Sequence, residues 1–477
     1  MTTNLLDPKM PSGWVELLSG RNAIYSLALS GGVALHAVNI YIVTTVMPSV
    51  VIDIGGLDYY AWSTTLFVVA SILGSALSVR LLRKTGSRGA YAAAAVLFAV
   101  GTAICSVAPS MPVLLAGRVV QGLGGGFLYA LAYSVIREVF PQSLWSRAIG
   151  LISAMWGVST LVGPAVGGAF AELGAWRAAF WSLIPMIGMF GLLAWFVLPG
   201  RRTGNIGGSS ALPSRQLILL CGAVLSVSAG STSTSLSFNI TGLLVAGIFI
   251  GLLFRVERTA DVRLLPTDAL GACSPLGALY ASVAFLVISM QPDVFVPYFL
   301  QVLHSQSPLT AGYLAALMAM GWTAASMISS GAAQKTASRL LVIGPLAVLA
   351  GLLVLCVTLP WHSGGQLMVL APISLGLVLV GFGIGLAWPH LVTRVFSNAP
   401  TSERDLAAGG VTTVQLSATA LGVAIAGMVA NLGGLTDPGG VAGASSAATA
   451  LFLSFALAPL IALFVVRRVL RQAALAI

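Results

Sequence analysis

Apolar runs of membrane length follow one another through almost all of this 477-residue chain. Each is near the roughly 20 residues that a helix needs to cross a bilayer, and together they predict about fourteen spans. The runs start near Asn22, Trp62, Gly89, Val113, Ala148, Ala178, Leu217, Ser237, Leu276, Leu309, Leu340, Leu367, Ala407 and Ala447. Hydrophobic residues make up 57% of the chain and charged residues only 8%, which excludes an ordinary soluble protein. The chain is expected to be an all-α polytopic membrane protein.

Basic residues indicate how the spans are oriented. When the spans alternate in direction, all 23 Lys and Arg residues except Arg118 and Arg177 fall on one side. The positive-inside rule makes that side cytoplasmic, so both termini are expected in the cytoplasm. The net charge of +10 is then a topology signal with no nucleic-acid partner. We predict a multi-pass protein of the bacterial plasma (inner) membrane, a monomer whose partners are the lipid bilayer, protons and a small-molecule substrate.

The chain also repeats itself. The segment Lys84–Arg88 (KTGSR) closes the second predicted span, and Lys335–Arg339 (KTASR) closes the tenth. A second pattern, three alternate glycines followed by an arginine and a phenylalanine, also occurs twice. Its first copy is Gly122, Gly124, Gly126, Arg137 and Phe140, and its second copy is Gly381, Gly383, Gly385, Arg394 and Phe396. Parallel halves of this kind are one known transporter architecture, with a substrate site at their interface. We predict N-terminal and C-terminal six-helix bundles over residues 1–198 and 261–477, with an inserted helix pair over 199–260.

Arg118 is the most unusual residue within a predicted span. It lies in the apolar run from Pro112 to Ile136 and is followed at helical spacing by Gln121. A guanidinium in hydrocarbon costs roughly 2.5 to 3.5 kcal/mol, so it normally faces the bundle interior and has a function there. Two roles are open: Arg118 could tie helices together through backbone carbonyls, or it could modulate a nearby carboxylate during transport.

Two motifs resemble those of a known family. The stretch Arg118–Gly126 matches the fourth-helix motif of the major facilitator superfamily, and Ser159–Gly168 matches its fifth-helix antiporter motif. The pair Trp176–Arg177 also sits where that family often has one. With the inserted pair, the whole chain resembles the fourteen-helix drug–proton antiporter branch. The resemblance implies the major facilitator fold, two six-helix bundles plus two inserted helices, and transport by alternating access.

Gating residues are expected in the fifth span and in the loop after the second. Gly163 and Gly167 are one helical turn apart and allow close helix packing, while Pro164 bends the helix. Gly168 completes this set, whose simpler interpretation is ordinary small-residue packing. In the loop, we assign gating to three basic residues: Arg83, Lys84 and Arg88.

Several positions depart from the family pattern, among them Val79 and Ser87 in the loop after the second span. Arg83 occupies the loop position that is usually acidic, and Asn39, nine residues before Pro48, stands where the antiporter branch often has an aspartate. A familiar proton-binding carboxylate is therefore missing. These departures favour the alternative of facilitated transport.

Two other residues could carry a proton. Asp293 follows Pro292 in the ninth span, about 10 Å from the expected outer end near Leu300 at 1.5 Å per residue. Intramembrane ionisable residues are functional by default, although this carboxylate could also snorkel to the outer interface. His36 shares a helix face with Asn39 and is either a hydrogen-bonded core histidine or a second titrating site. Asp293, His36 and Arg118 form the predicted proton-coupling set.

The predicted substrate-binding set combines polar and aromatic residues of the spans, although tryptophans near span ends are often interfacial anchors. Its members are Asn39, Gln121, Gln291, Trp62, Trp322 and Trp388. The leading hypothesis is proton-coupled efflux of amphipathic small molecules. The alternative is facilitative or proton-coupled transport of a specific metabolite or lipid.

An enzyme is the least favoured class. A membrane enzyme or lipid transferase needs clustered polar groups, and the chain offers only scattered histidines: His304, His362 and His390. The glycines after Gln121 follow no strand and end in no Lys-Ser or Lys-Thr, so they predict no nucleotide site. Cys105, Cys221, Cys273 and Cys356 have no paired spacing and are expected to be packing residues. We predict no catalytic residues, no metal and no cofactor.

Overall fold

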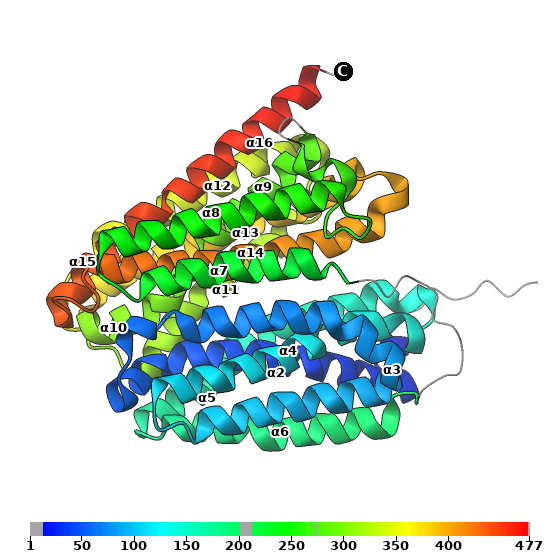
Figure 1. Ribbon diagram of the computed structural model, residues 1–477, viewed down its shortest axis with the longest axis horizontal. Helices are drawn as coiled ribbons and strands as arrows, with labels where there is room; N and C mark the ends of the chain where they lie inside the picture. Colours follow the sequence, from blue (N-terminus) through cyan, green and yellow to red (C-terminus); the bar gives the residue numbers. More distant parts are fainter. Residues whose placement is uncertain (1–12, 201–211, 272–273, 476–477) are drawn as a thin grey trace, which may run out of the picture.

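The computed structural model describes residues 13–200, 212–271 and 274–475, and this part of the chain is helical, without strands. Figure 1 shows long helices in two groups, with the inserted pair alongside the second. Four residues considered in the sequence, Lys9, Arg201, Arg202 and Cys273, lie outside the described residues.

The first group contains the helices up to residue 197: α1 (Trp14–Leu17), α2 (Gly20–Ile54), α3 (Trp62–Ser106), α4 (Met111–Val139), α5 (Trp145–Glu172) and α6 (Trp176–Val197). The inserted pair is α7 (Ser214–Ser231) and α8 (Leu236–Thr259). The second group contains α9 (Pro275–Ser289), α10 (Val296–His304), α11 (Pro308–Ser329), α12 (Gln334–Thr358), α13 (Leu367–Asn398), α14 (Arg404–Leu432), α15 (Gly440–Phe455) and α16 (Leu457–Leu475). Short 3₁₀ turns connect several of them: η1 (Leu57–Tyr59), η2 (Gln142–Leu144), η3 (Thr267–Leu270), η4 (Gln291–Phe295) and η5 (Thr401–Glu403).

The described helices make fourteen spans. Thirteen stretches are long and apolar enough to cross a membrane, and one of them, Leu57–Ser106, contains two spans. The chain turns at Gly86, whose positive φ of 73° interrupts α3. Gly74 and Gly101, on either side of this turn, both pack against one stretch of α4, Gln121–Leu123. The chain has therefore doubled back, and the predicted number of spans is confirmed.

The ninth span is longer than the sequence suggested. It begins as α9, changes to the 3₁₀ turn η4 around Pro292, and continues as α10 to His304 rather than ending near Leu300. Pro292 lacks an N–H, which interrupts the helical hydrogen bonding at this point. Asp293 lies in this break.

Glycines of α4 bring its backbone against both arms of α3. A side chain at Gly122 or Gly126 would collide with the backbone of Phe67 or Ser71 in the first arm, and one at Gly124 with Phe98 in the second. Ser71 Oγ also donates a hydrogen bond of 3.0 Å to the Gly122 carbonyl, and Ser75 Oγ one of 3.1 Å to Gly126. Close backbone contact and serine hydrogen bonds are typical of helix association in lipid.

The second group repeats this packing. A side chain at Gly381 or Gly385 would collide with the backbone of α11, and one at Gly383 with α12. Ser326 and Ser329 of α11 each donate to the Gly385 carbonyl at 3.3 Å. The glycines that repeat in the sequence thus occupy equivalent places in the two groups.

The second KTxSR segment differs from our expectation. Lys335–Arg339 lies in the first turns of α12 and does not close the preceding helix, which ends at Ser329. Its Ser338 Oγ accepts a 2.8 Å hydrogen bond from Arg394 near the end of α13. The equivalent Ser87 bonds to Glu138 near the end of α4. One serine position therefore joins equivalent helices through partners of opposite charge.

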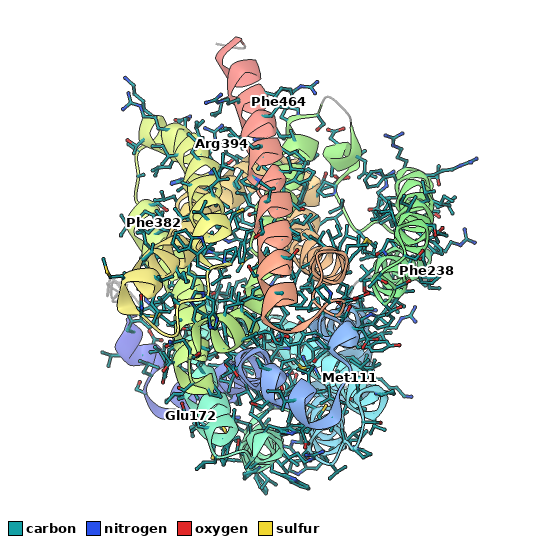
Figure 2. The ribbon with its side chains drawn as sticks, turned by 90° about the vertical axis from the view of Figure 1, so that its left-hand side faces the viewer. Met111, Glu172, Phe238, Phe382, Arg394 and Phe464 are labelled. Carbon is teal, nitrogen blue, oxygen red and sulfur yellow. The ribbon has the colours of Figure 1, made fainter. Side chains whose placement is uncertain are left out.

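The inserted pair stands at the edge of the molecule. α7 packs against α14 and α8, whereas α8 is largely exposed. Figure 2 shows Phe238 of α8 on the periphery, and this side chain is 50% exposed. In a membrane, α8 would face lipid, in keeping with its high hydropathy.

We predict that Gly122→Leu destabilises the folded protein by about 1–3 kcal/mol, because the new side chain forces α4 away from the backbone of Phe67. Thermal unfolding of purified protein in detergent measures the change. Gly188→Leu is the matched control, since Gly188 of α6 is exposed and has open space around it. Equal unfolding temperatures for the two variants would contradict this account of the α3–α4 contact.

Candidate functional site

Arg118 is enclosed within the first group of helices and is only 1% exposed. Its Nε donates to the Ser63 carbonyl at 3.1 Å, and one terminal nitrogen donates to Gln121 Oε1 at 2.5 Å. The guanidinium carbon also lies 4.1 Å from the centre of the Phe67 ring, a cation–π contact. These contacts join the guanidinium to α3 and to its own helix.

Gln121 extends this network. Its Nε2 donates to Thr102 Oγ1 at 2.8 Å, on the second arm of α3, and the residue is fully buried. Both ends of the amide are therefore used inside the bundle. In the conformation described here, Gln121 positions Arg118 and is not free to contact a substrate.

His36 contacts the same aromatic ring, that of Phe67. Its ring centre is 5.2 Å from that of Phe67, 5.5 Å from Tyr129 and 6.2 Å from Trp156. Its Nδ1 faces Gly125 and makes no good hydrogen bond among the described residues. Phe67 thus connects two of the three predicted proton-coupling residues, His36 and Arg118.

Asn39 lies one turn beyond His36 and is fully buried. Neither its amide oxygen nor its nitrogen has a hydrogen-bond partner among the described residues. Buried amides are usually paired, so a pair of unused donor and acceptor atoms here is notable. The hydrogen-bonding atoms of the Asn39 amide are therefore not used by any described residue.

Asp293 lies apart from Arg118 and His36. It is partly buried in the η4 break, and no hydrogen bond or ion pair in the described chain joins it to either residue. Its carboxylate is close enough to Tyr41 of α2 for electrostatic interaction. The neighbouring Gln291 donates to the Val287 carbonyl at 2.6 Å and packs on Gly422 of α14. Asp293 therefore sits where the two groups of helices meet.

The predicted substrate-binding tryptophans form two separate sets. Trp322 of α11 and Trp388 of α13 contact each other, with ring centres 5.1 Å apart. Trp62 begins α3 and contacts Tyr59 at 6.0 Å. The structure brings Trp322 and Trp388 together but leaves Trp62 near the start of its span.

The fifth-helix glycines lie between α2 and the second group. Gly163 and Gly167 pack against the backbone of α2, around Val38 and Ile42, and Gly168 packs against Leu309 of α11. Pro164 and Thr45 enclose Gly312 of α11 from the other side. The motif therefore holds α5 to its own group and to the second group at once.

The contact of Gly168 with Leu309 lies toward one end of the molecule, which we call the Asp53 end. At this end α2 and α5 end and α3, α6 and α11 begin. Here the Tyr60 ring stacks on Phe295 at 5.0 Å and meets Tyr298 at 5.7 Å. Asn431 of α14 donates to the Asp58 carbonyl at 3.1 Å. The two groups of helices are thus closed against each other at the Asp53 end.

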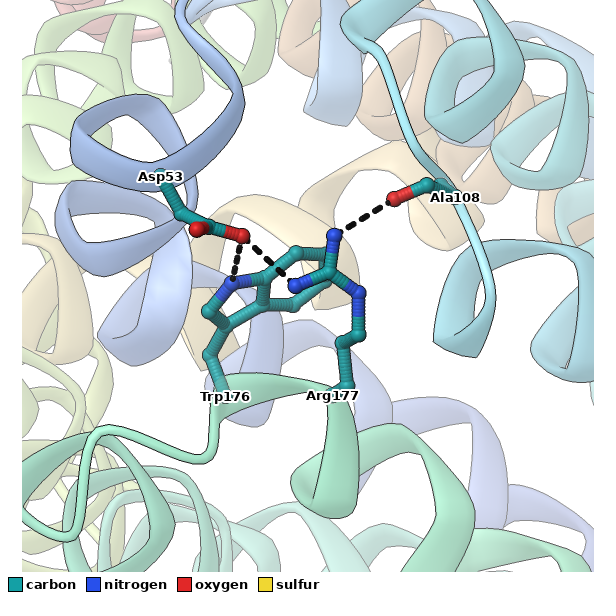
Figure 3. Close-up of polar contacts among 4 residues, drawn as sticks. All are labelled: Asp53, Ala108, Trp176 and Arg177. Carbon is teal, nitrogen blue, oxygen red and sulfur yellow. Dashed lines mark hydrogen bonds and ion pairs between the residues drawn. The ribbon is translucent and has the colours of Figure 1, made fainter.

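A polar cluster braces the first group at this end (Figure 3). Arg177 pairs with Asp53 at 2.6 Å and donates to the Ala108 carbonyl at 2.9 Å, while Trp176 Nε1 donates to the same Asp53 oxygen at 3.1 Å. The guanidinium also lies over the Trp176 ring at 4.2 Å. The cluster joins the ends of α2 and α3 to the start of α6.

The predicted gating loop is at the opposite end, which we call the Arg88 end. Arg88 donates from its backbone to the Pro199 carbonyl at 3.1 Å and from Nε to the Leu198 carbonyl at 3.3 Å. It also contacts the ring of Trp195. These contacts hold α3 to the end of α6 in the same group. The gating role of Arg83, Lys84 and Arg88 stays a prediction.

Comparison with known proteins decides the family. The sequence model of the Major Facilitator Superfamily matches residues 29–423, most of the chain. The chain belongs to the major facilitator superfamily. It is a multi-pass integral membrane transporter, not an enzyme, as the sequence predicted.

Relatives in the superfamily are similar over nearly the whole length. A probable multidrug-efflux transporter of Mycobacterium tuberculosis is 35% identical over 450 residues, 93% of each chain. Multidrug resistance protein 3 of Bacillus subtilis is 27% identical over 84% of this chain and 78% of its own. Among solved structures, a bacterial homologue of the human lysosomal transporter Spinster, inward-facing and unoccupied, has a TM-score of 0.66 at 17% identity, covering 94% of this chain and 98% of that one.

Several residues around the site were not singled out in the sequence. Phe67, Thr102 and Ser63 complete the surroundings of Arg118, and Asp53 completes those of Arg177. Phe67, Thr102 and Ser63 are ordinary residue types in a membrane helix and carry no signal of their own. Asp53 lies at the very end of α2, where a charged residue can reach the membrane surface and is not unusual. Only the helical spacing of Arg118 and Gln121 predicted part of the network.

We predict that Arg118→Lys destabilises the protein by about 2 kcal/mol, because a single ammonium cannot reproduce the separate bonds to Ser63 and Gln121 or the flat contact with Phe67. Thermal unfolding in detergent is the measurement. Arg255→Lys, at an exposed position on α8, is the control and should unfold with the wild type. If Arg118→Lys also unfolded at the wild-type temperature, the planar guanidinium group would not be needed for stability.

Proposed function

We propose that this chain exports amphipathic small molecules in exchange for protons by alternating access. The observation that carries the proposal is the 35% identity, over 93% of both chains, with a probable multidrug-efflux transporter. Aromatic and apolar side chains around His36, and the Trp322–Trp388 pair, offer surfaces that suit amphipathic molecules. The substrate-binding role of these residues is part of the proposal.

The orientation follows from the basic residues. With the Arg88 end in the cytoplasm of a bacterial inner membrane, both termini lie inside and the closed Asp53 end faces outward. The conformation described here is then closed to the outside. In the other conformation, the contacts of Gly168 with Leu309 and of Tyr60 with Phe295 separate.

Proton coupling is assigned to Asp293, with His36 as the second candidate. Asp293 lies in a helix break next to Tyr41 of the opposite group, so rocking of the two groups changes its surroundings directly. His36 and Arg118 share the Phe67 ring, so a charge on one affects the other. One charge moved through 100 mV supplies about 2.3 kcal/mol, which supports roughly a fortyfold substrate gradient.

A second function, facilitative or proton-coupled transport of a specific metabolite or lipid, is favoured by one observation. Asn39 replaces a carboxylate and is buried with both amide atoms unpaired among the described residues. Such an amide suits a substrate with matching hydrogen-bond groups. Uncoupler sensitivity and the breadth of the substrate range distinguish the two functions.

We predict that inverted membrane vesicles containing this protein accumulate a fluorescent cationic dye and that an uncoupler abolishes the accumulation. Asp293→Asn should reduce accumulation at least tenfold while leaving dye binding in place. His36→Gln tests the second candidate, since a titrating His36 requires a changed pH profile of transport. Vesicles without the protein are the control.

Two results would contradict the proposal. Dye accumulation that persists with the uncoupler would remove proton coupling, and a failure to transport several unrelated amphipathic dyes would favour the specific-metabolite alternative. Full coupled transport by Asp293→Asn would remove this residue from the mechanism.

We also predict that a cross-link at the Asp53 end stops transport. A Cβ at Gly427 of α14 would lie 2.7 Å from Ala61 Cβ in the first group, so a small displacement lets cysteines at 61 and 427 form a disulfide. Oxidised Ala61→Cys/Gly427→Cys protein should lose transport, and a reductant should restore it. The two single variants are controls, and oxidised double variant that transports normally would show that this end need not open.

A further inference from the structure

A cavity of about 300 Å³ lies outside the residues discussed so far, between the inserted pair and the helices α9 and α14. Its walls are largely apolar, with Leu220 and Val224 from α7, Leu253 from α8, Ala284 from α9 and Leu421 from α14. None of the predicted coupling, substrate-binding or gating residues lines it. The cavity therefore has no role in the transport mechanism proposed above.

A smaller, more polar cavity adjoins this one. A second cavity of about 70 Å³ shares Glu257, Leu265 and Leu270 with the first. It is also lined by Arg258 and Arg263. A long apolar cavity thus adjoins a small cavity that is lined by two arginines at the Arg88 end, which we call the mouth.

The mouth is held in a fixed shape by a buried carboxylate. Glu257 is only 4% exposed, and one of its oxygens accepts hydrogen bonds from the backbone N–H groups of Leu264 and Leu265 at 2.6 and 2.7 Å. Gln216 of α7 donates to its other oxygen at 3.2 Å. The turn after α8 is therefore tied to both inserted helices.

A second carboxylate ties the same turn to α14. Glu403 accepts hydrogen bonds from the Thr267 N–H at 2.8 Å and the Thr267 hydroxyl at 2.5 Å. These bonds hold the pKa of the Glu403 carboxyl below its usual value, so the contact persists at neutral pH. The mouth is thus preformed by the fold.

The arginines of the mouth keep their charge available. Arg258 donates to the Leu270 carbonyl, and Arg263 to the Ala260 carbonyl and the Thr267 hydroxyl. Neither forms an ion pair with a described residue. Neutral acceptors make the hydrogen bonds to both guanidinium groups, and the Glu403 carboxylate acts on Arg263 only through space. Each guanidinium has five N–H donors, so further donors remain for a phosphate.

The length of the apolar part fits one leaflet of a membrane. Along α9 the lining residues run from Gly277 to Ile288, about 16 Å at 1.5 Å per residue. Half of a hydrocarbon core of about 30 Å is about 15 Å. An acyl chain that enters beside a headgroup at the Arg88 end would fill this space.

We propose that this cavity binds an anionic glycerophospholipid as a resident ligand, with an acyl chain between the inserted pair and α9–α14 and the phosphate at Arg258 and Arg263. The lipid fills the space between the inserted pair and the second group. Basic residues at a membrane surface attract anionic lipids, and the apolar walls retain the chain. The proposal concerns binding alone and does not depend on what the protein transports.

Native mass spectrometry of the delipidated full-length protein tests the proposal. The protein is supplied in turn with phosphatidylglycerol, phosphatidylcholine and inorganic phosphate. We expect one tightly held phosphatidylglycerol, at least fivefold favoured over phosphatidylcholine, and no retained phosphate. Arg258→Ala/Arg263→Ala should abolish the fivefold preference, and Ala284→Phe or Ser417→Phe, which fill the cavity from α9 and α14, should lose the bound lipid.

Two control positions lie on α8 outside the cavity. Arg255→Ala removes an exposed charge of α8, and Leu244→Phe adds bulk at a 64% exposed position, and both should keep the lipid. Retention at the wild-type level by both cavity-filling variants would overturn the proposal. So would equal binding of the two lipids, or a transported dye occupying the cavity in place of lipid.

Discussion

Close contact between helix backbones at glycine is the constraint on which the rest of this structure depends. Lipid offers helices no hydrophobic gain for associating, so van der Waals contact and interhelical hydrogen bonds must hold them together. Gly122, Gly124 and Gly126 allow this contact between α4 and both arms of α3, with serine hydroxyls bonding to glycine carbonyls. Arg118 is on the same helix, one turn before Gly122. Its bond to the Ser63 carbonyl requires the separation of α3 and α4 that the glycines set.

The same principle divides the molecule into parts that stay together and parts that can separate. Within each group, backbones meet along whole helices, and the Asp53–Arg177 cluster braces the end of the first group. Between the groups, the contacts described here involve a few positions at one end, such as Gly168 with Leu309 and Tyr60 with Phe295. Such an arrangement suits rigid bodies that rock about a shared interface.

Hydropathy and repeated glycines predicted much of this fold, since a span needs only enough consecutive apolar residues and a repeat needs only self-similarity. The starts of the spans and the superfamily could therefore be predicted from sequence. Side-chain partners could not, because Asp53 and Arg177 are 124 residues apart and the rotation of each helix decides which residues meet. The Lys335–Arg339 segment was placed wrongly for a different reason. Similar local sequences suit both the end of one helix and the start of the next, and this segment begins α12. The gating and coupling roles remain predictions.

Asn431 has a consequence for the inserted pair. Its amide nitrogen donates both to Asp58 in the first group and to the Ser231 carbonyl at the end of α7. The Asn431 side chain therefore joins α14, the first group and the inserted pair. Separation of the two groups would break the bond to Asp58 but not the bond to Ser231. The bond to Ser231 thus attaches the inserted pair to α14 beside the contact between the two groups, so the sequence of α7 bears on the same residue that joins those groups.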